Sequence, residues 1–439
     1  MRLANKAFAD ISFGGEIFRG ASPQKIFAMS EKNFDCIVIG GGAAGMMAAG
    51  TAAGLGRKVL LLERNDRLGK KLSITGKGRC NVTNACTDEE FFANIPVNPR
   101  FLYSAYSRFN CYDCMDFFEK LGVPLKTERG NRVFPISDRA EDITAALENF
   151  CRDGGVKIIR KRVTKILAED GVITGVQCGE TVFNASSVLI ATGGKSYPGT
   201  GSDGDGYRFA EALGHTIVPL KPSLVPLEAE ENFCQEMMGL SLKNVGVSVI
   251  DTKAGKIIFR DQGEMLFTHF GVSGPMILSA SSHIREMEQG RYKIEIDMKP
   301  ALDSAALDKR ILRDFSEIPN RLFANSLSKL LPAKMIPVIV RLSGISPEKQ
   351  VNAVTKQERA ALVELLKHLT VTVKKFRPIS EAIITSGGVK VSEISPKTMG
   401  SKLVQGLFFA GEVIDADAYT GGFNLQIAFS TAVSAGSNM

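Results

Sequence analysis

Short apolar runs bounded by glycine alternate with helix-like stretches near the start of the chain. Phe34–Ile39 and Lys58–Leu62 predict buried parallel strands, and Ala43–Leu55 predicts a helix of small residues between them. A strand, a helix and a second strand within about 30 residues form the unit that each half of a Rossmann-type sheet requires. Further on, Asp138–Asp153 has the spacing of an amphipathic helix, for which Asp138 is the expected N-cap.

The pattern then changes from helical to alternating. Val156–Phe183 alternates and breaks at Gly171 and Gly179, which predicts a small antiparallel meander. Val188–Ile190 predicts another buried strand, and Gly204–Leu213 predicts a helix.

Three prolines in Pro219–Pro226 predict a linker, after which the chain has the character of an inserted domain. We expect a β-rich part over 223–300 and a helical part over 301–374. The expected strands are Asn244–Ile250, Lys256–Phe259 and Tyr292–Asp297, and the expected helices are Ser304–Phe315, Pro332–Leu342 and Lys356–His368.

The apolar strand-and-glycine pattern returns after the insert, with an expected strand at Leu407–Ala410 and a final helix at Gly422–Ala435. The sequence therefore predicts an α/β protein with a Rossmann-like domain in two parts, residues 33–222 and 375–439, interrupted by residues 223–374. Residues 1–32 differ from the rest, and we expect a disordered extension or an upstream start, with Met29 as the native start.

Composition narrows the class of protein. The chain has 439 residues, of which 44% are hydrophobic, and none of its apolar runs reaches the roughly 18–20 residues of a membrane span. Eight cysteines in a chain of this length do not suggest a disulfide framework, so we expect a cytoplasmic protein. The formal charge of +7 comes from scattered cations, and an anionic cofactor explains it without nucleic acid.

The motif Gly40-Gly41-Gly42-Ala43-Ala44-Gly45 follows a predicted strand and opens a predicted helix. In this dinucleotide-binding pattern Gly40 permits the tight turn, Gly42 lets the backbone approach a pyrophosphate, and Gly45 allows close packing. Glu63 ends the next strand, where an acid accepts hydrogen bonds from a ribose and disfavours the 2′-phosphate of NADP.

Three further glycine-containing segments accompany this fingerprint. Residues 67–84 interleave glycines with cations and polar residues, as suits a loop against an anion. Ala191-Thr192-Gly193-Gly194 follows a predicted strand and continues into a glycine-rich loop. Near the C-terminus, 406–415 ends a strand in Gly411-Glu412, and a glycine pair opens the final helix, whose N-terminus could hold the negative charge of a reduced flavin.

Together, GGGAAG, RLGKKLSITGKGRCNVTN, ATGGKSYPGTGSDGDGY and GLFFAGEVIDADAYTGGFNLQIA resemble the BaiN/YhiN-like NAD(P)/FAD-dependent oxidoreductases, from about residue 33 to the C-terminus. The resemblance implies a glutathione-reductase-like FAD domain with a β-rich and helical insert. The resemblance also implies that several segments besides the Gly40–Gly45 fingerprint contact the cofactor. The expected FAD-binding residues are Gly40, Gly42, Ala43, Ala44, Gly45, Glu63, Arg64, Lys70, Gly78, Arg79, Cys80, Asn81, Val163, Ala191, Thr192, Gly193, Gly411, Glu412, Asp415, Gly422, Phe423, Asn424 and Leu425.

A flavin performs redox chemistry while the protein orients the substrate and supplies protons. His269, Tyr197 and Tyr419 are the candidate catalytic residues, since each lies in a glycine-containing loop of a motif. The remaining histidines have no metal-ligand spacing, so no metal is expected. One fingerprint rather than two argues against a separate NAD(P)H domain, so a nicotinamide donor would reach the flavin transiently through the substrate cleft.

The expected function is hydride transfer between bound FAD and a small organic substrate, with NAD(P)H open as co-substrate. Two alternatives remain at this point. A tRNA-modifying flavoprotein would use the basic charge, but it would need a distinct basic RNA-binding region, and the sequence has none. An FAD-binding electron-transfer protein would have no organic substrate of its own. The sequence does not indicate the substrate or the oligomeric state.

Overall fold

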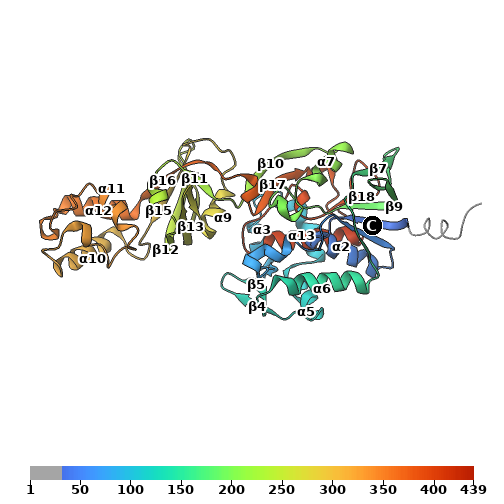
Figure 1. The fold of residues 1–439 in the computed structure, drawn as a ribbon, viewed down its shortest axis with the longest axis horizontal. Helices are drawn as coiled ribbons and strands as arrows, with labels where there is room; N and C mark the ends of the chain where they lie inside the picture. The colour runs from blue at the N-terminus through green and yellow to red at the C-terminus, as the bar shows by residue number, and fades with distance from the viewer. Residues whose placement is uncertain (1–31) are drawn as a thin grey trace, which may run out of the picture.

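The computed structural model describes residues 32–439, so the expectations about residues 1–31 and Met29 lie outside the described part. The molecule is elongated, with a sheet and its helices at one end and a barrel followed by helices at the other (Figure 1). Among the described residues, no helix is long and apolar enough to cross a membrane.

A seven-stranded sheet carries the expected Rossmann-like unit. Its strands run in the order β6-β2-β1-β9-β8-β7, and β18 pairs with the end of β9. Strands β6, β2, β1, β9 and β18 are parallel, and α2 (Ala43–Gly54) connects β1 to β2. The strands are β1 (Asn33–Ile39), β2 (Val59–Glu63), β6 (Lys157–Arg160), β7 (Lys165–Glu169), β8 (Val172–Cys178), β9 (Thr181–Ile190) and β18 (Leu407–Phe409).

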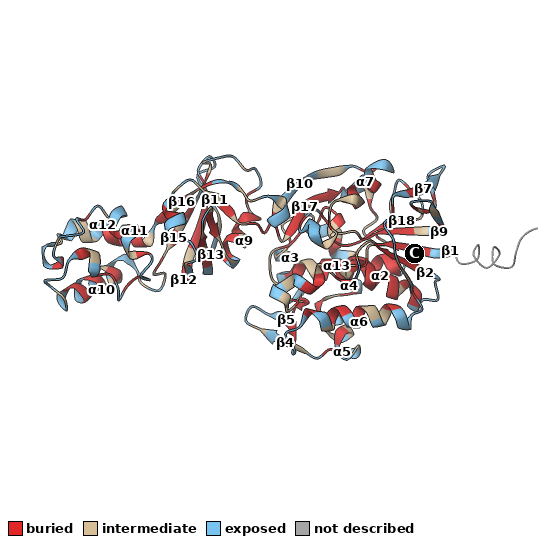
Figure 2. Ribbon diagram, in the orientation of Figure 1, coloured by how far each residue is buried: buried red, intermediate tan, exposed pale blue. Residues whose placement is uncertain are grey.

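The C-terminal helix α13 (Phe423–Gly436) packs against α2. Both helices are buried on nearly every side (Figure 2), as expected for helices that are apolar all round, and the small residues of α2 allow a close approach. The remaining elements of this half are α3 (Asp88–Ala93), α4 (Tyr103–Arg108), α5 (Cys111–Lys120), α6 (Ala140–Asp153), α7 (Asp205–Ala212), the sheet of β3 (Thr83–Asn84), β5 (Arg132–Pro135) and β4 (Leu125–Glu128), and the pair β10 (Ile217–Ser223) and β17 (Ile384–Val389).

The other half is a closed six-stranded barrel with helices beyond it (Figure 1). Its core is a second cluster of buried apolar side chains from Leu227 to Val373. The barrel strands are β11 (Leu227–Ala229), β14 (Gly271–Ser273), β13 (Lys256–Thr268), β12 (Ser241–Asp251), β15 (Tyr292–Asp297) and β16 (Leu369–Phe376), and the helices are α8 (Phe233–Glu236), α9 (Pro275–Ser281), α10 (Ser304–Ser316), α11 (Ile336–Leu342) and α12 (Lys356–Lys367).

Long-range pairing overturns several local predictions. Lys157–Arg160 pairs in parallel with β2, so only β7, β8 and β9 form the expected antiparallel meander. The proline-containing stretch predicted as a linker forms β10, which pairs with β17. Residues 369–374, predicted within the helical part, belong to β16, which closes the barrel against β11.

The predicted N-cap at Asp138 is also wrong, because Arg139 occupies the N-cap position of α6. Asp138 has φ +58°, and its carboxylate lies 2.6 Å from Arg79 and 2.8 Å from Lys126. The Asp138 side chain, which the sequence pattern predicts to cap α6, therefore forms ion pairs instead. Asn110 caps α5, on which Cys111 and Cys114 are buried free thiols.

Candidate functional site

A cavity of about 870 Å³, here named the strand-end cavity, opens where the parallel strands end. Gly40 follows β1, Arg64 follows β2, Ala191 follows β9 and Ala410 follows β18, and all four residues line it. Carboxyl ends of parallel strands are where Rossmann-like folds bind their ligands. Residues 75–77 and 419–425 form further walls, and the barrel half contributes Leu224, Glu264, Pro275 and Leu278.

The N-terminus of α2 opens into this cavity. Gly42 is the N-cap, no side chain caps the helix, and no atom lies within 4 Å of the position that a Cβ at Gly42 would take. Gly45 has the opposite environment, because a Cβ there would overlap the Gly40 carbonyl oxygen. Gly42 therefore leaves space for a ligand at a helix end with positive partial charge, while Gly45 allows α2 to pack on β1.

Glu63 is buried at the end of β2 and holds the neighbouring turns. Its carboxylate accepts hydrogen bonds from the backbone N–H of Gly41 at 2.7 Å, the backbone N–H of Asn65 at 2.7 Å, and the Asn65 side-chain amide at 2.8 Å. A carboxylate has about four acceptor positions, so Glu63 retains capacity for a ribose hydroxyl. Arg64 instead contacts carboxylates, since its guanidinium lies 2.6 Å from Asp203.

Two buried polar atoms of the cavity wall have no partner among the described residues. They are the Oδ1 atom of Asn81 and the Oγ1 atom of Thr192, and both residues line the strand-end cavity. An unpaired buried polar group costs roughly 1–3 kcal/mol, so such groups in a cavity indicate a polar ligand.

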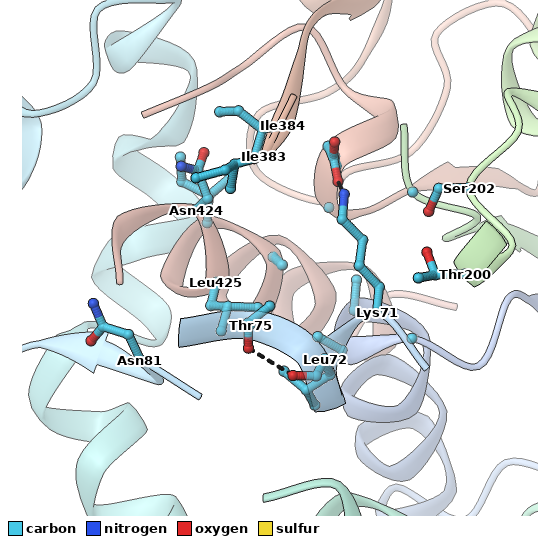
Figure 3. A pocket seen from close by; sticks show the side chains of 18 of the residues that line it. Lys71, Leu72, Thr75, Asn81, Thr200, Ser202, Ile383, Ile384, Asn424 and Leu425 are labelled. Atoms are coloured by element: carbon cyan, nitrogen blue, oxygen red, sulfur yellow. Dashed lines mark hydrogen bonds and ion pairs between the residues drawn. The ribbon is translucent and has the colours of Figure 1, made fainter. Parts of the chain in front are cut away.

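Lys71 bridges segments that are distant in the sequence. Its Nζ atom lies 2.6 Å from Glu412 Oε2 and donates to Ser196 Oγ at 2.7 Å. The other Glu412 oxygen accepts from the backbone N–H of Thr385 at 2.9 Å. Figure 3 shows the Lys71 side chain between Thr200 and Ser202 on one side and Ile383 and Asn424 on the other. The pair therefore joins the glycine-and-cation loop to the strand end after β18.

Removing Lys71 by Lys71→Met is expected to destabilise the protein, because it leaves the Glu412 carboxylate without its cation. The paired side chains are 22% and 21% exposed, so we expect a coupling energy of about 1–2 kcal/mol, between values for exposed and buried pairs. A double-mutant cycle with Glu412→Gln, read by urea unfolding, measures this energy. Strictly additive effects of the two substitutions would contradict the prediction.

The second uncapped helix end at the cavity belongs to α13. Gly422 is its N-cap with φ +100°, and a Cβ there would overlap the Thr83 carbonyl oxygen. Asn424 holds the preceding loop, because its side chain accepts from the Ala418 backbone N–H at 2.9 Å and donates to the Ala418 carbonyl at 2.8 Å. This loop places Tyr419 in the cavity wall.

Tyr419 contacts a histidine of the barrel half. Its hydroxyl lies 3.4 Å from His283 Nδ1, and the two rings stack with centroids 4.6 Å apart. Burial raises the pKa of Tyr419 and lowers the pKa of His283. Burial also raises the pKa of Asp415 and of Asp417, whose side chains are hydrogen-bonded to Asn98 and to Ser386.

Most residues expected from the sequence to bind the cofactor lie around one cavity. Those that line it are Gly40, Gly42, Ala43, Ala44, Glu63, Arg64, Lys70, Arg79, Asn81, Val163, Ala191, Thr192, Gly193, Gly411, Glu412, Gly422, Phe423, Asn424 and Leu425. Gly45, Gly78, Cys80 and Asp415 lie outside the lining, and Cys80 and Asp415 are buried.

The three candidate catalytic residues are not together. Tyr419 lines the strand-end cavity, whereas Tyr197 and His269 do not. Tyr197 is 37% exposed, and His269 is exposed with its ring against Phe270. Lys71 and His283 were missed from the sequence. Lys71 adjoins the expected Lys70 in a single motif, but no local signal marks His283, whose contact with Tyr419 spans 136 positions.

The fold and this cavity define a Rossmann-like nucleotide-binding oxidoreductase of the flavin-dependent class. The chain belongs to the family described as HI0933-like protein Rossmann domain, whose model matches residues 34–438. It is 30% identical over 406 residues to 3-dehydro-bile acid delta(4,6)-reductase of Clostridium scindens, covering 91% of this chain and 97% of that protein. It is 32% identical over 402 residues to ribosomal RNA dihydrouridine synthase of Escherichia coli, covering 91% of this chain and 96% of that protein.

A solved structure shares the fold. It is 3-ketosteroid delta1-dehydrogenase from Sterolibacterium denitrificans, at 14% identity and a TM-score of 0.50, covering 92% of this chain and 99% of that chain. The resemblance to the BaiN/YhiN-like family and the α/β fold class expected from the sequence are both confirmed.

The cavity fits FAD. The uncapped N-terminus of α2 suits a pyrophosphate, the open space at Gly42 admits it, and the N-terminus of α13 suits the polar edge of a flavin ring. Asn81 and Thr192 offer unpaired polar atoms in the wall of the same cavity. Among residues 32–439, no group of three or more His, Cys, Asp and Glu side chains could hold a metal ion.

Proposed function

We propose that this enzyme reduces a carbon–carbon double bond conjugated to a carbonyl group in a small organic molecule, with NAD(P)H as the source of electrons. The observation that carries the proposal is the position of Tyr419, a protonated hydroxyl in the wall of the strand-end cavity near residues of the barrel half. The names of two relatives support this chemistry. A bile acid delta(4,6)-reductase and a dihydrouridine synthase both saturate such a bond.

A bound flavin would supply hydride donation and acceptance in this cavity. Around it, the N-terminus of α13 provides positive potential, while the Lys71 ammonium is paired with the Glu412 carboxylate. Leu224, Pro275 and Leu278 give the barrel side an apolar surface, which suits an apolar substrate and limits water.

Saturating the double bond requires one proton in addition to the hydride, and Tyr419 is the proposed donor. Burial raises its pKa above the usual value of 10.0, so the hydroxyl remains protonated at neutral pH. Of the three candidates expected from the sequence, it is the one that lines the cavity. His269 and Tyr197 would need to move to reach a substrate there.

The proposed nicotinamide donor would use the same opening as the substrate. The single fingerprint at Gly40–Gly45 is already assigned to FAD in this proposal, so NAD(P)H would bind and leave before the substrate enters. Such an order predicts ping-pong kinetics.

Uridine in ribosomal RNA is the second candidate substrate. It is favoured by 32% identity to the Escherichia coli ribosomal RNA dihydrouridine synthase over 96% of that protein and by the formal charge of +7. The uracil double bond is conjugated to a carbonyl, so the same site chemistry would apply. This candidate differs from the first in requiring affinity for RNA that weakens with salt.

Anaerobic stopped-flow spectroscopy tests the proposal. The FAD-loaded protein is reduced with NADH or NADPH and then mixed with conjugated enones, with uridine-containing ribosomal RNA, with a one-electron acceptor or with buffer. We expect flavin reoxidation and a saturated product with enones. Product from RNA alone would favour the second candidate, and reoxidation by one-electron acceptors alone would indicate an electron-transfer protein.

A further inference from the structure

His283 lies where the barrel half meets the strand-end cavity. It follows α9, whose first residue Pro275 lines that cavity. Its ring stacks on Tyr419 at an interplanar angle of 19°, and Phe259 lies on it with centroids 5.1 Å apart. The imidazole thus contacts both an aromatic side chain of the barrel and the tyrosine of the cavity wall.

One hydrogen bond holds Tyr419 within its own half, and another joins the two halves beside the pair. The backbone N–H of Tyr419 donates to the Asn94 carbonyl at 3.0 Å. The hydroxyls of Thr420 and Ser279, one from each half, lie 3.2 Å apart. With Asn424 holding the loop, Tyr419 has little freedom to turn away from His283.

Both groups of the pair are uncharged at neutral pH. Burial lowers the pKa of His283 below 6.5, and the nearby Arg285 guanidinium lowers it further. Burial raises the pKa of Tyr419; Arg285 opposes this rise and Asp417 adds to it. A neutral imidazole has one N–H donor and one acceptor nitrogen, so it can pass a proton across its ring.

We propose that His283 is a positioning residue that orients the Tyr419 hydroxyl and returns its proton after each turnover. The inference rests on the proposed function, the reduction of a conjugated double bond. In that reaction the Tyr419 O–H bond breaks as a C–H bond forms on the substrate, whose other new hydrogen is the hydride from reduced flavin. The Nδ1–H bond of His283 then breaks as the Tyr419 O–H bond re-forms, and Nε2 takes a proton from water. Before the next turnover Nδ1 takes a proton from solvent and Nε2 releases one to solvent, so the Nδ1–H tautomer is restored.

This assignment makes the barrel half part of the reacting assembly. Tyr419 comes from the segment before α13, and His283 comes from the segment after α9. Proton return therefore requires the two halves to keep their contact, although the cofactor contacts expected from the sequence lie outside the barrel.

The first test uses His283→Phe, which keeps a stacking ring and removes both nitrogens. We expect substrate reduction by the reduced enzyme to slow by roughly 10–100-fold, with KM within about twofold; this is less than the roughly 10²–10⁴-fold contribution of a positioned acid itself, because His283 acts through Tyr419. Anaerobic flavin reduction by NAD(P)H should remain within about twofold of wild type. His368→Phe is the matched control, because His368 is 49% exposed beside Glu295.

The Tyr419→Phe variant and the double variant separate positioning from a general structural effect. If the two residues act as one unit, the double variant is no slower than Tyr419→Phe alone. Multiplying effects would instead indicate independent roles and would overturn the proposal.

A second test does not depend on turnover. Tyrosinate absorbance is measured against pH in the FAD-loaded protein. Subtracting the curve of the Tyr419→Phe variant from that of the wild type leaves the titration of Tyr419, whose midpoint can then be read. We expect His283→Phe to raise it, since the Nδ1–H group no longer stabilises the phenolate. The charged groups that act on the pair, Arg285 and Asp417, and Asp415 beside Asp417 are unchanged in this comparison.

If the wild type is active and the His283→Phe variant keeps either the wild-type reduction rate or the wild-type titration midpoint of Tyr419, this inference is overturned while the proposed function stands. A wild type that reduces no conjugated double bond in enones or RNA overturns the proposed function, and the proton-return role with it. Slower reduction together with a raised midpoint supports the assignment.

Discussion

Gly42→Asp is expected to yield a folded protein that binds FAD at least about 100-fold more weakly than wild type. The new carboxylate would enter the strand-end cavity at the N-terminus of α2, the position proposed for the pyrophosphate. Two charges of the same sign about 5 Å apart repel by roughly 3 kcal/mol at an effective dielectric constant of about 20, which corresponds to roughly 100-fold in affinity. Equilibrium titration of the apoprotein with FAD, followed by flavin fluorescence, measures the change.

The same substitution should not damage the apoprotein. Gly42 has φ −85°, no atom lies within 4 Å of a Cβ built there, and aspartate is a favourable N-cap residue. We therefore expect the thermal midpoint of the apoprotein to be unchanged or raised.

Gly42→Asn is the matched control, because asparagine has nearly the same shape without the charge. A smaller loss of affinity in Gly42→Asn than in Gly42→Asp is expected. Equal losses would attribute the effect to bulk, and unchanged FAD affinity in both variants would remove the pyrophosphate from this helix end.

Tyr419→Phe is expected to lower the rate of substrate reduction by roughly 10²–10⁴-fold, the usual contribution of a positioned acid. The ring and its stacking on His283 remain, so the cavity should keep its shape. Rapid-mixing experiments on the two half-reactions give the measurement. Flavin reduction by NAD(P)H should be nearly unchanged, while reoxidation by a conjugated substrate should be slow.

Tyr112→Phe provides the comparison for Tyr419→Phe. Tyr112 lies on α5, is 53% exposed and does not line the strand-end cavity. If Tyr419→Phe reduces the substrate as fast as Tyr112→Phe, Tyr419 is excluded as the proton donor. The buried carboxyl groups of Asp415 and Asp417, whose pKa values are raised by burial, would then be the next candidates for that role.

The parallel sheet was readable from the sequence because each of its features is local. Buried strands appear as apolar runs, and the turn at Gly40 and the close packing at Gly45 each require glycine for a reason that nearby residues supply. Glu63 could likewise be expected at a strand end, where the structure finds it bonded to the Gly41 and Asn65 backbones.

Predictions failed where pairing or charge over long distances decided the outcome. The prolines at 219 and 222 predict a linker, but β10 forms there because β17, more than 150 residues later, provides a partner strand. Asp138 predicts a cap, but Arg79 and Lys126 attract its carboxylate instead. Leu369–Phe376 follows a helix, yet it becomes the strand that closes the barrel.

The sequence by itself determined the nucleotide-binding fold, the family and the segments that meet at the strand ends, because glycine turns and buried strands leave local patterns. The tertiary structure alone decided which side chains face one another in the cavity. It paired Lys71 with Glu412 across 341 positions and His283 with Tyr419 across 136 positions. The physical reason is that such contacts depend on how the two halves pack, and no local pattern of polar and apolar residues encodes the distance between side chains so far apart in the chain.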